Sequence, residues 1–174
     1  QKLRPAFDRE GTVTAGNASG INDGASAIIL ASESAVAKYG LTPLVELGSY
    51  AQSGLDPKIM GLGPVEAVSK ALDKADLTLE EVDLFELNEA FAAQALGVMY
   101  QLSEQHDLPL EAFKSKVNVN GGAIALGHPL GASGNRIIVS LIHEMLARKT
   151  TYGIASLCVG GGMGTAVLLK GIEG

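Results

Sequence analysis

The chain of 174 residues contains one cysteine and no tryptophan. A single cysteine cannot form an internal disulfide, which indicates a reducing compartment such as the cytoplasm. No apolar run reaches the roughly 18 residues of a membrane-spanning helix, and no signal peptide is recognisable. Basic runs are also missing, and the net charge of −6 argues against binding to nucleic acid or to a membrane surface. These absences favour a cytoplasmic globular protein.

Motifs for metals and nucleotides are missing as well. One cysteine and three scattered histidines give no spacing that would hold a metal ion. The sequence has no phosphate-binding loop ending in Gly-Lys-Ser/Thr, no Gly-x-Gly-x-x-Gly dinucleotide pattern and no Gly-x-Ser-x-Gly nucleophile elbow. We therefore expect neither a metal nor a resident cofactor.

What the chain does have is apolar content of 47% and alternating strand and helix patterns. From residue 44 onward their order is typical of a mostly parallel sheet that is covered by helices and closed by an antiparallel hairpin. Between two of the helices, residues 106–116 are expected to form a polar connection. Strands are predicted over residues 25–30, 44–50, 82–87, 117–119, 152–158 and 165–169, and helices over 33–39, from 63 to about 72, 89–102 and 131–148.

Three short motifs follow predicted strands or lie in a loop beside them. They are Asn88-Glu89-Ala90-Phe91, Gly127-His128-Pro129 and Cys158-Val159-Gly160-Gly161-Gly162. In α/β sheets, ligands bind at the carboxyl ends of the strands, so the amide, the imidazole and the thiol can converge there. An amide can fix a water molecule, an imidazole can move protons, and a thiol beside free backbone N–H groups can attack or deprotonate a substrate. Together the motifs predict an active site.

Each motif also has a structural explanation. Cys158 could be an inert buried thiol at a strand end. His128, held in an extended backbone by Pro129, could be a loop histidine bonded to a neighbouring carbonyl. Asn88 precedes a predicted helix and could simply be its N-cap. The other two histidines, His106 and His143, are expected to face solvent.

The motifs, taken in order, resemble the C-terminal half of the thiolase family, close to its acetyl-CoA acetyltransferase type. The likeness extends from Lys2 to about Leu169. It rests on the three motifs above together with Gly16-Asn17-Ala18-Ser19-Gly20 and Met60-Gly61-Leu62-Gly63-Pro64. The resemblance implies the α/β thiolase fold, a mixed sheet covered by helices, and a coenzyme A thioester as the substrate.

The resemblance also implies roles for individual residues. Cys158 matches the cysteine that shuttles a proton while a carbon–carbon bond is made or broken. His128 matches the histidine that activates the nucleophilic cysteine and helps to bind a thioester oxygen, and Asn88 matches the residue that holds a water in the same oxyanion site. Gly160 matches the backbone N–H of the other oxyanion site. Positions near the pantetheine arm or the acyl pocket are matched by Ser19, Met60, Phe91 and Phe7.

The chain departs from the family in one respect, because the nucleophilic cysteine belongs to the N-terminal half and Cys158 is the only cysteine here. The first residue is Gln1, and we expect a fragment of a longer polypeptide or a processed chain. Residues 1–40, with strand 25–30 and helix 33–39, are then the end of the preceding half, and 41–174 the C-terminal domain. The expected partners are acyl-CoA or CoA, the missing half, and further copies in a dimer or tetramer. The alternative is a non-catalytic thioester-binding or scaffold module.

Overall fold

Four strands form a mixed sheet within residues 3–172, the part of the chain that the computed structural model describes. The strands are β1 (Val45–Gly54), β2 (Leu84–Leu87), β3 (Tyr152–Val159) and β4 (Met163–Gly171), in the spatial order β1-β4-β3-β2. Strand β2 runs parallel to β3, whereas β4 runs antiparallel to both β3 and β1. The mixed sheet and its terminal hairpin are confirmed. The expectation of a mostly parallel sheet is wrong, because β4 is inserted between β1 and β3.

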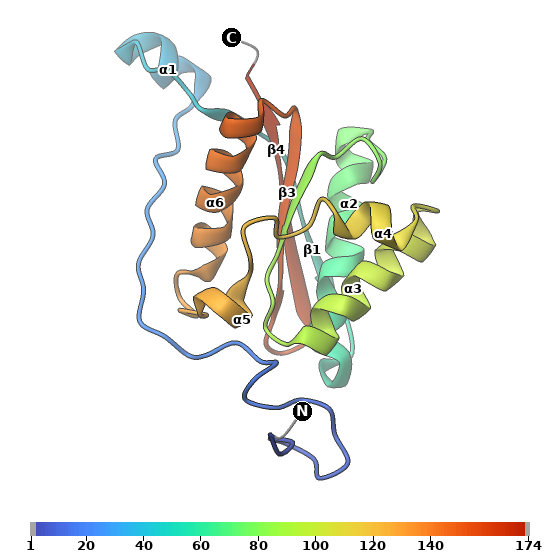
Figure 1. Ribbon diagram of the computed structural model, residues 1–174. Helices are drawn as coiled ribbons and strands as arrows, with labels where there is room; N and C mark the ends of the chain where they lie inside the picture. Colours follow the sequence, from blue (N-terminus) through green and yellow to red (C-terminus); the bar gives the residue numbers. More distant parts are fainter. Residues whose placement is uncertain (1–2, 173–174) are drawn as a thin grey trace.

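Helices cover both faces of this sheet (Figure 1). One face carries α2 (Gly63–Ala75), α3 (Ala92–Gln105) and α4 (Leu110–Lys114), and the other face carries α6 (Ser133–Arg148). The helical spacing expected from the sequence is confirmed, since Val65, Val68 and Leu72 of α2 are buried in one core. On α6, the residues Ile137, Leu141 and Met145 are buried in the second core. Each such side chain contributes about 1.5–3 kcal/mol to folding.

Three short helices lie where the sequence predicts only connections, namely η1 (Pro57–Leu62), α4 and α5 (Ala123–Leu126). The polar connection expected over 106–116 is therefore partly wrong. Within it, α4 buries Phe113 completely, and the Phe113 ring packs edge-to-face on Phe85 with 4.9 Å between ring centroids. A helix of five residues has too few turns to show a periodic pattern.

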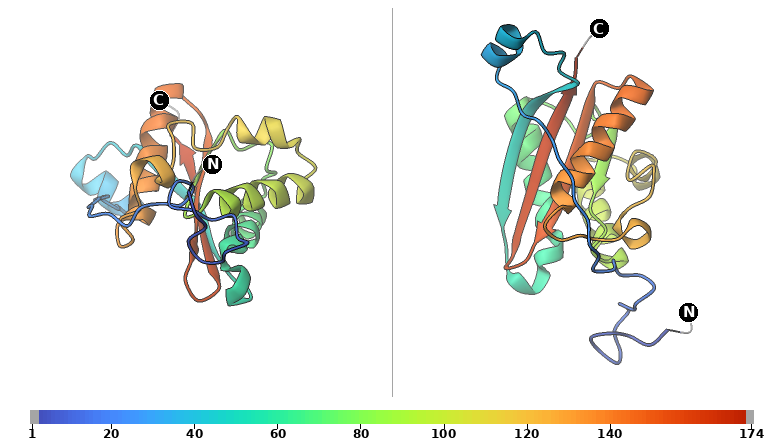
Figure 2. Two further views of the ribbon diagram at one scale, coloured as in Figure 1. Left: turned by 60° about the horizontal axis from the view of Figure 1, so that its bottom comes forward. Right: turned by 90° about the vertical axis from the view of Figure 1, so that its left-hand side faces the viewer.

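The N-terminal segment runs in an extended conformation along the side of the sheet that carries α6 (Figure 2). It leads into the predicted helix α1 (Glu33–Tyr39), whose first turn is capped by the Ser32 hydroxyl accepting from the Ala35 N–H at 3.2 Å. Residues 25–30 form no strand, and Ile29 and Leu30 are 91% and 82% exposed. The buried strand predicted here is therefore wrong for this structure, because the segment pairs with no other strand among residues 3–172.

Two predicted boundaries are corrected by the hydrogen bonds. The strand over 117–119 is reduced to one bridge between Val117 and Phe85, because Asn118 adopts a left-handed backbone with φ of 47°. Helix α3 begins at Ala92 and not at residue 89. Residues 1–2 and 173–174 lie outside the described residues, although the expected domain spans include them. Within 3–172, no helix is long and apolar enough to cross a membrane.

Candidate functional site

Asn88 and Cys158 are brought to the same edge of the sheet by parallel pairing of β2 with β3. Leu87 at the end of β2 is in register with Ser156 of β3, and the Asn88 N–H donates to the Ser156 carbonyl at 3.0 Å. Cys158 lies two residues further along β3. This edge is the lower end of the sheet in Figure 1, where α5, the beginning of α6 and the N-terminal segment also lie. The expected gathering at the carboxyl ends of the strands is confirmed for these two residues.

The side chain of Asn88 is 3% exposed, yet neither its Oδ1 nor its Nδ2 has a hydrogen-bond partner among the described residues. The interpretation of Asn88 as an N-cap is wrong. Phe91 occupies the N-cap position of α3, and the Ala92 N–H donates to the Asn17 carbonyl of the N-terminal segment at 2.9 Å. A buried amide that stays unpaired costs about 1–3 kcal/mol, so a bound water or ligand group would stabilise this side chain.

Asn118 fixes the end of β2 immediately before Asn88, a role that no motif in the sequence predicts. Its Oδ1 accepts from the Leu87 N–H at 2.8 Å, and its Nδ2 donates to the Leu87 carbonyl at 2.7 Å. The side chain thus makes the two hydrogen bonds that a neighbouring strand would have made. The only hint in the sequence is that an asparagine tolerates the left-handed backbone better than most residues.

Glu89 holds the loop before His128 against the end of β2. Its carboxylate accepts from Asn118 Nδ2 and from the Ile124 N–H, each at 3.3 Å. A Cβ on Gly122 would approach the Glu89 carboxyl carbon to 2.3 Å, so only glycine allows this close contact. The loop is therefore built around a carboxylate from the Asn88 motif.

His128 is half-buried, and both its backbone and its ring are anchored. The His128 N–H donates to the Gly20 carbonyl at 2.9 Å, and ring Nδ1 lies 2.6 Å from Ser133 Oγ. The structural alternative, a ring bonded to a neighbouring carbonyl, is wrong, since the ring contacts a hydroxyl. Burial and the nearby Arg136 guanidinium lower the pKa of His128 below its usual value, so the ring is neutral at pH 7.

The other two histidines are not part of this edge of the sheet. His143 is exposed, as expected. His106 is half-buried and its Nε2 lies 2.9 Å from Ser69 Oγ, so the expectation that it faces solvent is wrong. Burial lowers its pKa, while Asp73 acts in the opposite direction.

Burial raises the pKa of the Cys158 thiol. Cys158 is only partly exposed, and it is protonated at neutral pH for that reason. A protonated thiol can give its proton to a carbanion or a leaving group, and it becomes a base after it has lost that proton.

Two of the glycines after Cys158 have different surroundings. At one position the backbone packs so closely on its neighbours that no side chain fits, and at the other a side chain would meet open space. Gly162 has φ of 91°, and a Cβ there would lie 2.2 Å from the Leu55 carbonyl oxygen. By contrast, a Cβ on the exposed Gly160 would meet nothing within 4 Å. Gly162 therefore shapes the turn, while Gly160 faces open space beside the thiol.

Residues 18–21 of the N-terminal segment connect the Asn88 motif to the His128 loop. The Ser19 hydroxyl and the Ser19 N–H both donate to the Ala90 carbonyl at 3.0 Å, and Ala18 forms a bridge with Phe91. Two residues later, Ile21 forms a bridge with His128. The Asn88 and His128 motifs are thus linked through one extended segment.

Three further predicted site residues lie around this segment. The Phe7 ring packs edge-to-face on Phe91 with 6.1 Å between centroids. Met60 lies on η1, which is tied to α3 where Gln94 Nε2 donates to the Gly61 carbonyl at 3.0 Å. Ser19, Phe7 and Phe91 are therefore in one cluster, whereas Met60 is connected to it through Gln94 and α3.

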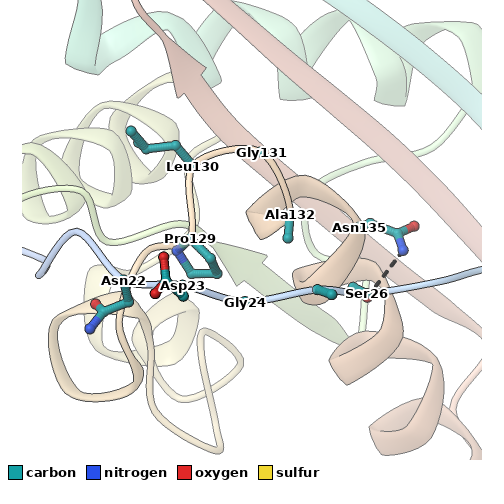
Figure 3. A pocket seen from close by; sticks show the side chains of 10 residues that line it. Asn22, Asp23, Gly24, Ser26, Pro129, Leu130, Gly131, Ala132 and Asn135 are labelled. Atoms are coloured by element: carbon teal, nitrogen blue, oxygen red, sulfur yellow. Dashed lines mark hydrogen bonds between the residues drawn. The ribbon is translucent and has the colours of Figure 1, made fainter.

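A hollow of about 420 Å³ lies beside this site (Figure 3). It is lined by residues 22–26 of the N-terminal segment and by residues 129–132 with Asn135, whose Nδ2 donates to Ser26 Oγ at 3.0 Å. Neither Asn88 nor Cys158 contributes to its wall. Among residues 3–172, no three histidine, cysteine or acidic side chains are grouped so that they could hold a metal ion.

Comparison with known proteins gives consistent matches over nearly the whole chain. A model of the thiolase C-terminal domain matches residues 41–171, and a model of the thiolase N-terminal domain matches residues 1–34. An acetyl-CoA acetyltransferase of Escherichia coli is 57% identical over 168 residues, which are 97% of this chain and 41% of the relative. The chain thus spans about two fifths of the length of that relative.

Solved structures agree with these matches. The crystal structure of the acetyl-CoA acetyltransferase of Bacillus anthracis superimposes with a TM-score of 0.90 at 51% identity, covering 98% of this chain and 41% of that one. The structure of human mitochondrial 3-ketoacyl-CoA thiolase in complex with CoA gives a TM-score of 0.86 at 49% identity, covering 99% and 42%.

Proposed function

Because the chain belongs to the thiolase family, we propose that the protein at its native length is an acyltransferase acting on coenzyme A thioesters. The reaction is the condensation of two acetyl-CoA molecules to acetoacetyl-CoA and CoA, or the reverse thiolysis of a 3-ketoacyl-CoA. This chain supplies the acid/base cysteine and the groups that stabilise an oxyanion. Relatives named acetyl-CoA acetyltransferase and 3-ketoacyl-CoA thiolase support this assignment.

The observation that carries the proposal is the unpaired amide of Asn88. Its two polar atoms are buried without partners among residues 3–172, although folding alone would favour an apolar side chain there. A water held by this amide, together with a donor from His128, would stabilise the negative charge that develops on a thioester oxygen. Loss of one such donor lowers the rate about 10²–10³-fold.

The proton transfers follow from the states of the two titratable groups. In thiolysis the sulfur of the nucleophilic cysteine bonds to C3 of the 3-ketoacyl group, the bond between C2 and C3 breaks, and the protonated thiol of Cys158 gives its proton to the enolate carbon of the acetyl-CoA that leaves. The acyl group then passes from the nucleophilic cysteine to the sulfur of a second CoA. In condensation the Cys158 thiolate takes that proton back from the methyl group of acetyl-CoA. Neutral His128 accepts the proton of the nucleophilic thiol and returns it when the acyl group leaves. The Gly160 N–H faces the second oxyanion.

The substrate would lie along the cluster formed by the N-terminal segment and α3. The Ser19 side chain faces the pantetheine arm, while Phe91 and Phe7 line the acyl pocket with Met60. The solved complex of the human mitochondrial 3-ketoacyl-CoA thiolase with CoA supports CoA as the common part of the substrate. The shape of the acyl pocket in the complete protein sets which acyl group is preferred.

The nucleophilic cysteine must come from the N-terminal half, because Cys158 is the only cysteine of this chain. Large apolar side chains on the segment and loop beside the site support a covering partner. Ile21 is 85% exposed, Leu130 is 65% and Leu126 is 58%. Exposed apolar groups that adjoin one another mark interaction surfaces. The proposed assembly therefore pairs this chain with the N-terminal half, and copies of the complete protein form a dimer or tetramer.

The test compares two asparagines in the native-length protein. The side chain of Asn88 has no hydrogen-bond partner among the described residues, whereas that of Asn118 bonds to the Leu87 backbone. We expect Asn88→Ala to lower kcat about 10²–10³-fold and to leave the free energy of unfolding within about 1 kcal/mol of the wild type, or to raise it, because no bonded partner is lost. The matched control is Asn118→Ala, which leaves the Leu87 N–H and carbonyl unpaired and costs about 1–3 kcal/mol.

Steady-state kinetics with acetyl-CoA and acetoacetyl-CoA, together with denaturant unfolding, measure both quantities. Unchanged turnover in Asn88→Ala would contradict the oxyanion role.

The Cys158→Ser variant distinguishes the proposed enzyme from the alternative function, a thioester-binding module without catalysis. Calorimetry would measure CoA affinity and an isotope-exchange assay would measure exchange at the α-carbon of acetyl-CoA. Intact binding with lost exchange supports the enzyme. If the unaltered protein binds CoA and shows neither exchange nor turnover, the binding module is the correct assignment.

A further inference from the structure

Ser133, the first residue of α6, contacts the His128 ring on the side away from Nε2. Ser133 is 1% exposed, and its Oγ lies 2.6 Å from His128 Nδ1 and 3.2 Å from the Pro129 carbonyl oxygen. The Pro129 carbonyl also accepts from the Ala132 and Ser133 N–H groups at 2.7 and 2.9 Å. The hydroxyl is therefore enclosed between the imidazole and the first turn of the helix.

The number of hydrogens links the directions of these two bonds. A serine hydroxyl has one proton to donate and two lone pairs to accept with. The Pro129 carbonyl can take the proton of Ser133, but it can donate nothing to Ser133. If the hydroxyl donates to Pro129, its contact with His128 requires a proton on Nδ1. The neutral ring then carries its free lone pair on Nε2.

The choice of tautomer matters because the ring is neutral. Burial and the positive charge of Arg136, which lies one turn along α6 from Ser133, both disfavour the doubly protonated ring. A neutral imidazole has only one nitrogen that can accept a proton. A ring with its proton on Nε2 could not accept the proton of a thiol that approaches this nitrogen.

We propose that Ser133 is a positioning residue that holds His128 in the tautomer with Nδ1 protonated, so that Nε2 can accept a proton. This inference rests on the proposed function, in which His128 takes the proton of a nucleophilic thiol. When that thiol loses its proton to Nε2, the ring becomes an imidazolium and Nδ1–H continues to donate to Ser133 Oγ. The positive ring is thereby held in the same orientation until the proton is returned.

The tautomer can be measured without any reference to catalysis. Solid-state NMR of the native-length protein labelled with ¹⁵N-histidine distinguishes protonated from unprotonated ring nitrogens, and His128→Gln identifies the signals of His128. At pH 7.5 we expect the Nδ1 of His128 to be protonated and Nε2 to be unprotonated. In Ser133→Ala we expect both signals to broaden or shift towards a mixture of tautomers, while Ser133→Thr, which keeps the hydroxyl, restores the wild-type signals.

A matched control is the second serine–histidine pair of the chain. Ser69 Oγ lies 2.9 Å from His106 Nε2, far from the His128 loop in sequence. Ser69→Ala should change the signals of His106 and leave those of His128 unaltered. A wild-type His128 with its proton on Nε2, or ring signals that Ser133→Ala does not change, would overturn the inference.

Kinetics then separate this inference from the function on which it rests. We expect Ser133→Ala to lower kcat about 10- to 10²-fold, as is typical when the partner that orients a histidine is lost. We also expect it to move the acidic limb of the pH–rate profile, and Ser133→Thr to restore both. An altered tautomer with unchanged kcat and pH profile would support the positioning of the ring by Ser133 and would contradict the proton-accepting role of His128.

Discussion

Glu86 is a carboxylate placed among apolar side chains. It is 4% exposed and, being two residues after Leu84 on β2, it faces the core beneath α6. Burial raises its pKa to about 7, Glu89 and Glu144 act in the same direction, and Arg136 opposes them. Near neutral pH this side chain therefore lies between its neutral and its charged form.

The raised pKa of Glu86 predicts how stability depends on pH. Between pH 4.5 and 7 the folded protein keeps the Glu86 proton while the unfolded chain loses it, so stability falls as the pH rises. We expect Glu86→Gln to be about 1–3 kcal/mol more stable than the wild type above pH 7 and nearly equal to it near pH 4. Urea unfolding at a series of pH values measures this difference.

The matched control is Glu104→Gln, which changes an exposed carboxylate on α3. A stability difference for Glu86→Gln that is constant with pH, or equal to that of the control, would contradict a raised pKa.

At the scale of elements, the site depends on how a strand ends rather than on the strand itself. β2 has four residues, all of them buried, and its last peptide is held by Asn118 in place of another strand. β3 ends in a turn whose Gly162 contacts the backbone of Leu55, and the Leu55 N–H donates to the Gly162 carbonyl at 2.8 Å. These contacts fix the backbone on which Asn88 and Cys158 lie.

Two glycines of this turn should respond differently to the same substitution. We expect Gly162→Ala to lower the free energy of unfolding by at least about 2 kcal/mol, because its φ is positive and its Cβ would overlap the Leu55 carbonyl. Gly160→Ala should change stability by less than about 1 kcal/mol, since the added methyl group meets no neighbour. Thermal unfolding of the two variants decides the question, and equal destabilisation would show that the turn is not fixed by this contact.

At the scale of the whole molecule, large apolar side chains are exposed along the N-terminal segment, on the side of the sheet that carries α6 (Figure 2). The segment over residues 25–30 pairs with no strand in the described structure, and Ile29 and Leu30 are 91% and 82% exposed. Burying each of these side chains would contribute about 1.5–3 kcal/mol to an association. This exposed surface supports the proposed pairing of the chain with an N-terminal half.

We expect this chain on its own to have no appreciable thiolase activity, because it lacks a second cysteine. The measurement is thiolysis of acetoacetyl-CoA by the purified 174-residue chain, compared with the native-length protein. Robust turnover by the chain alone that Cys158→Ala abolishes would contradict the need for a second half.

The sequence by itself determined the α/β class, the terminal hairpin, most helices and the motifs around Asn88, His128 and Cys158. Helical spacing and turn residues are local signals, and they predict local structure well. They did not predict that β4 lies between β1 and β3, because strand order depends on pairing between distant residues.

Only the tertiary structure decided which contacts the candidate site residues make. It showed that Phe91 and not Asn88 occupies the N-cap of α3, that Asn118 bonds to Leu87 and Ser133 contacts the His128 ring, and that Ile29 and Leu30 are exposed. Each of these facts depends on contacts between distant chain segments or on how deeply a side chain is buried. A side chain's burial, its hydrogen-bond partners and its pKa are set by these neighbours, and a linear pattern does not specify them.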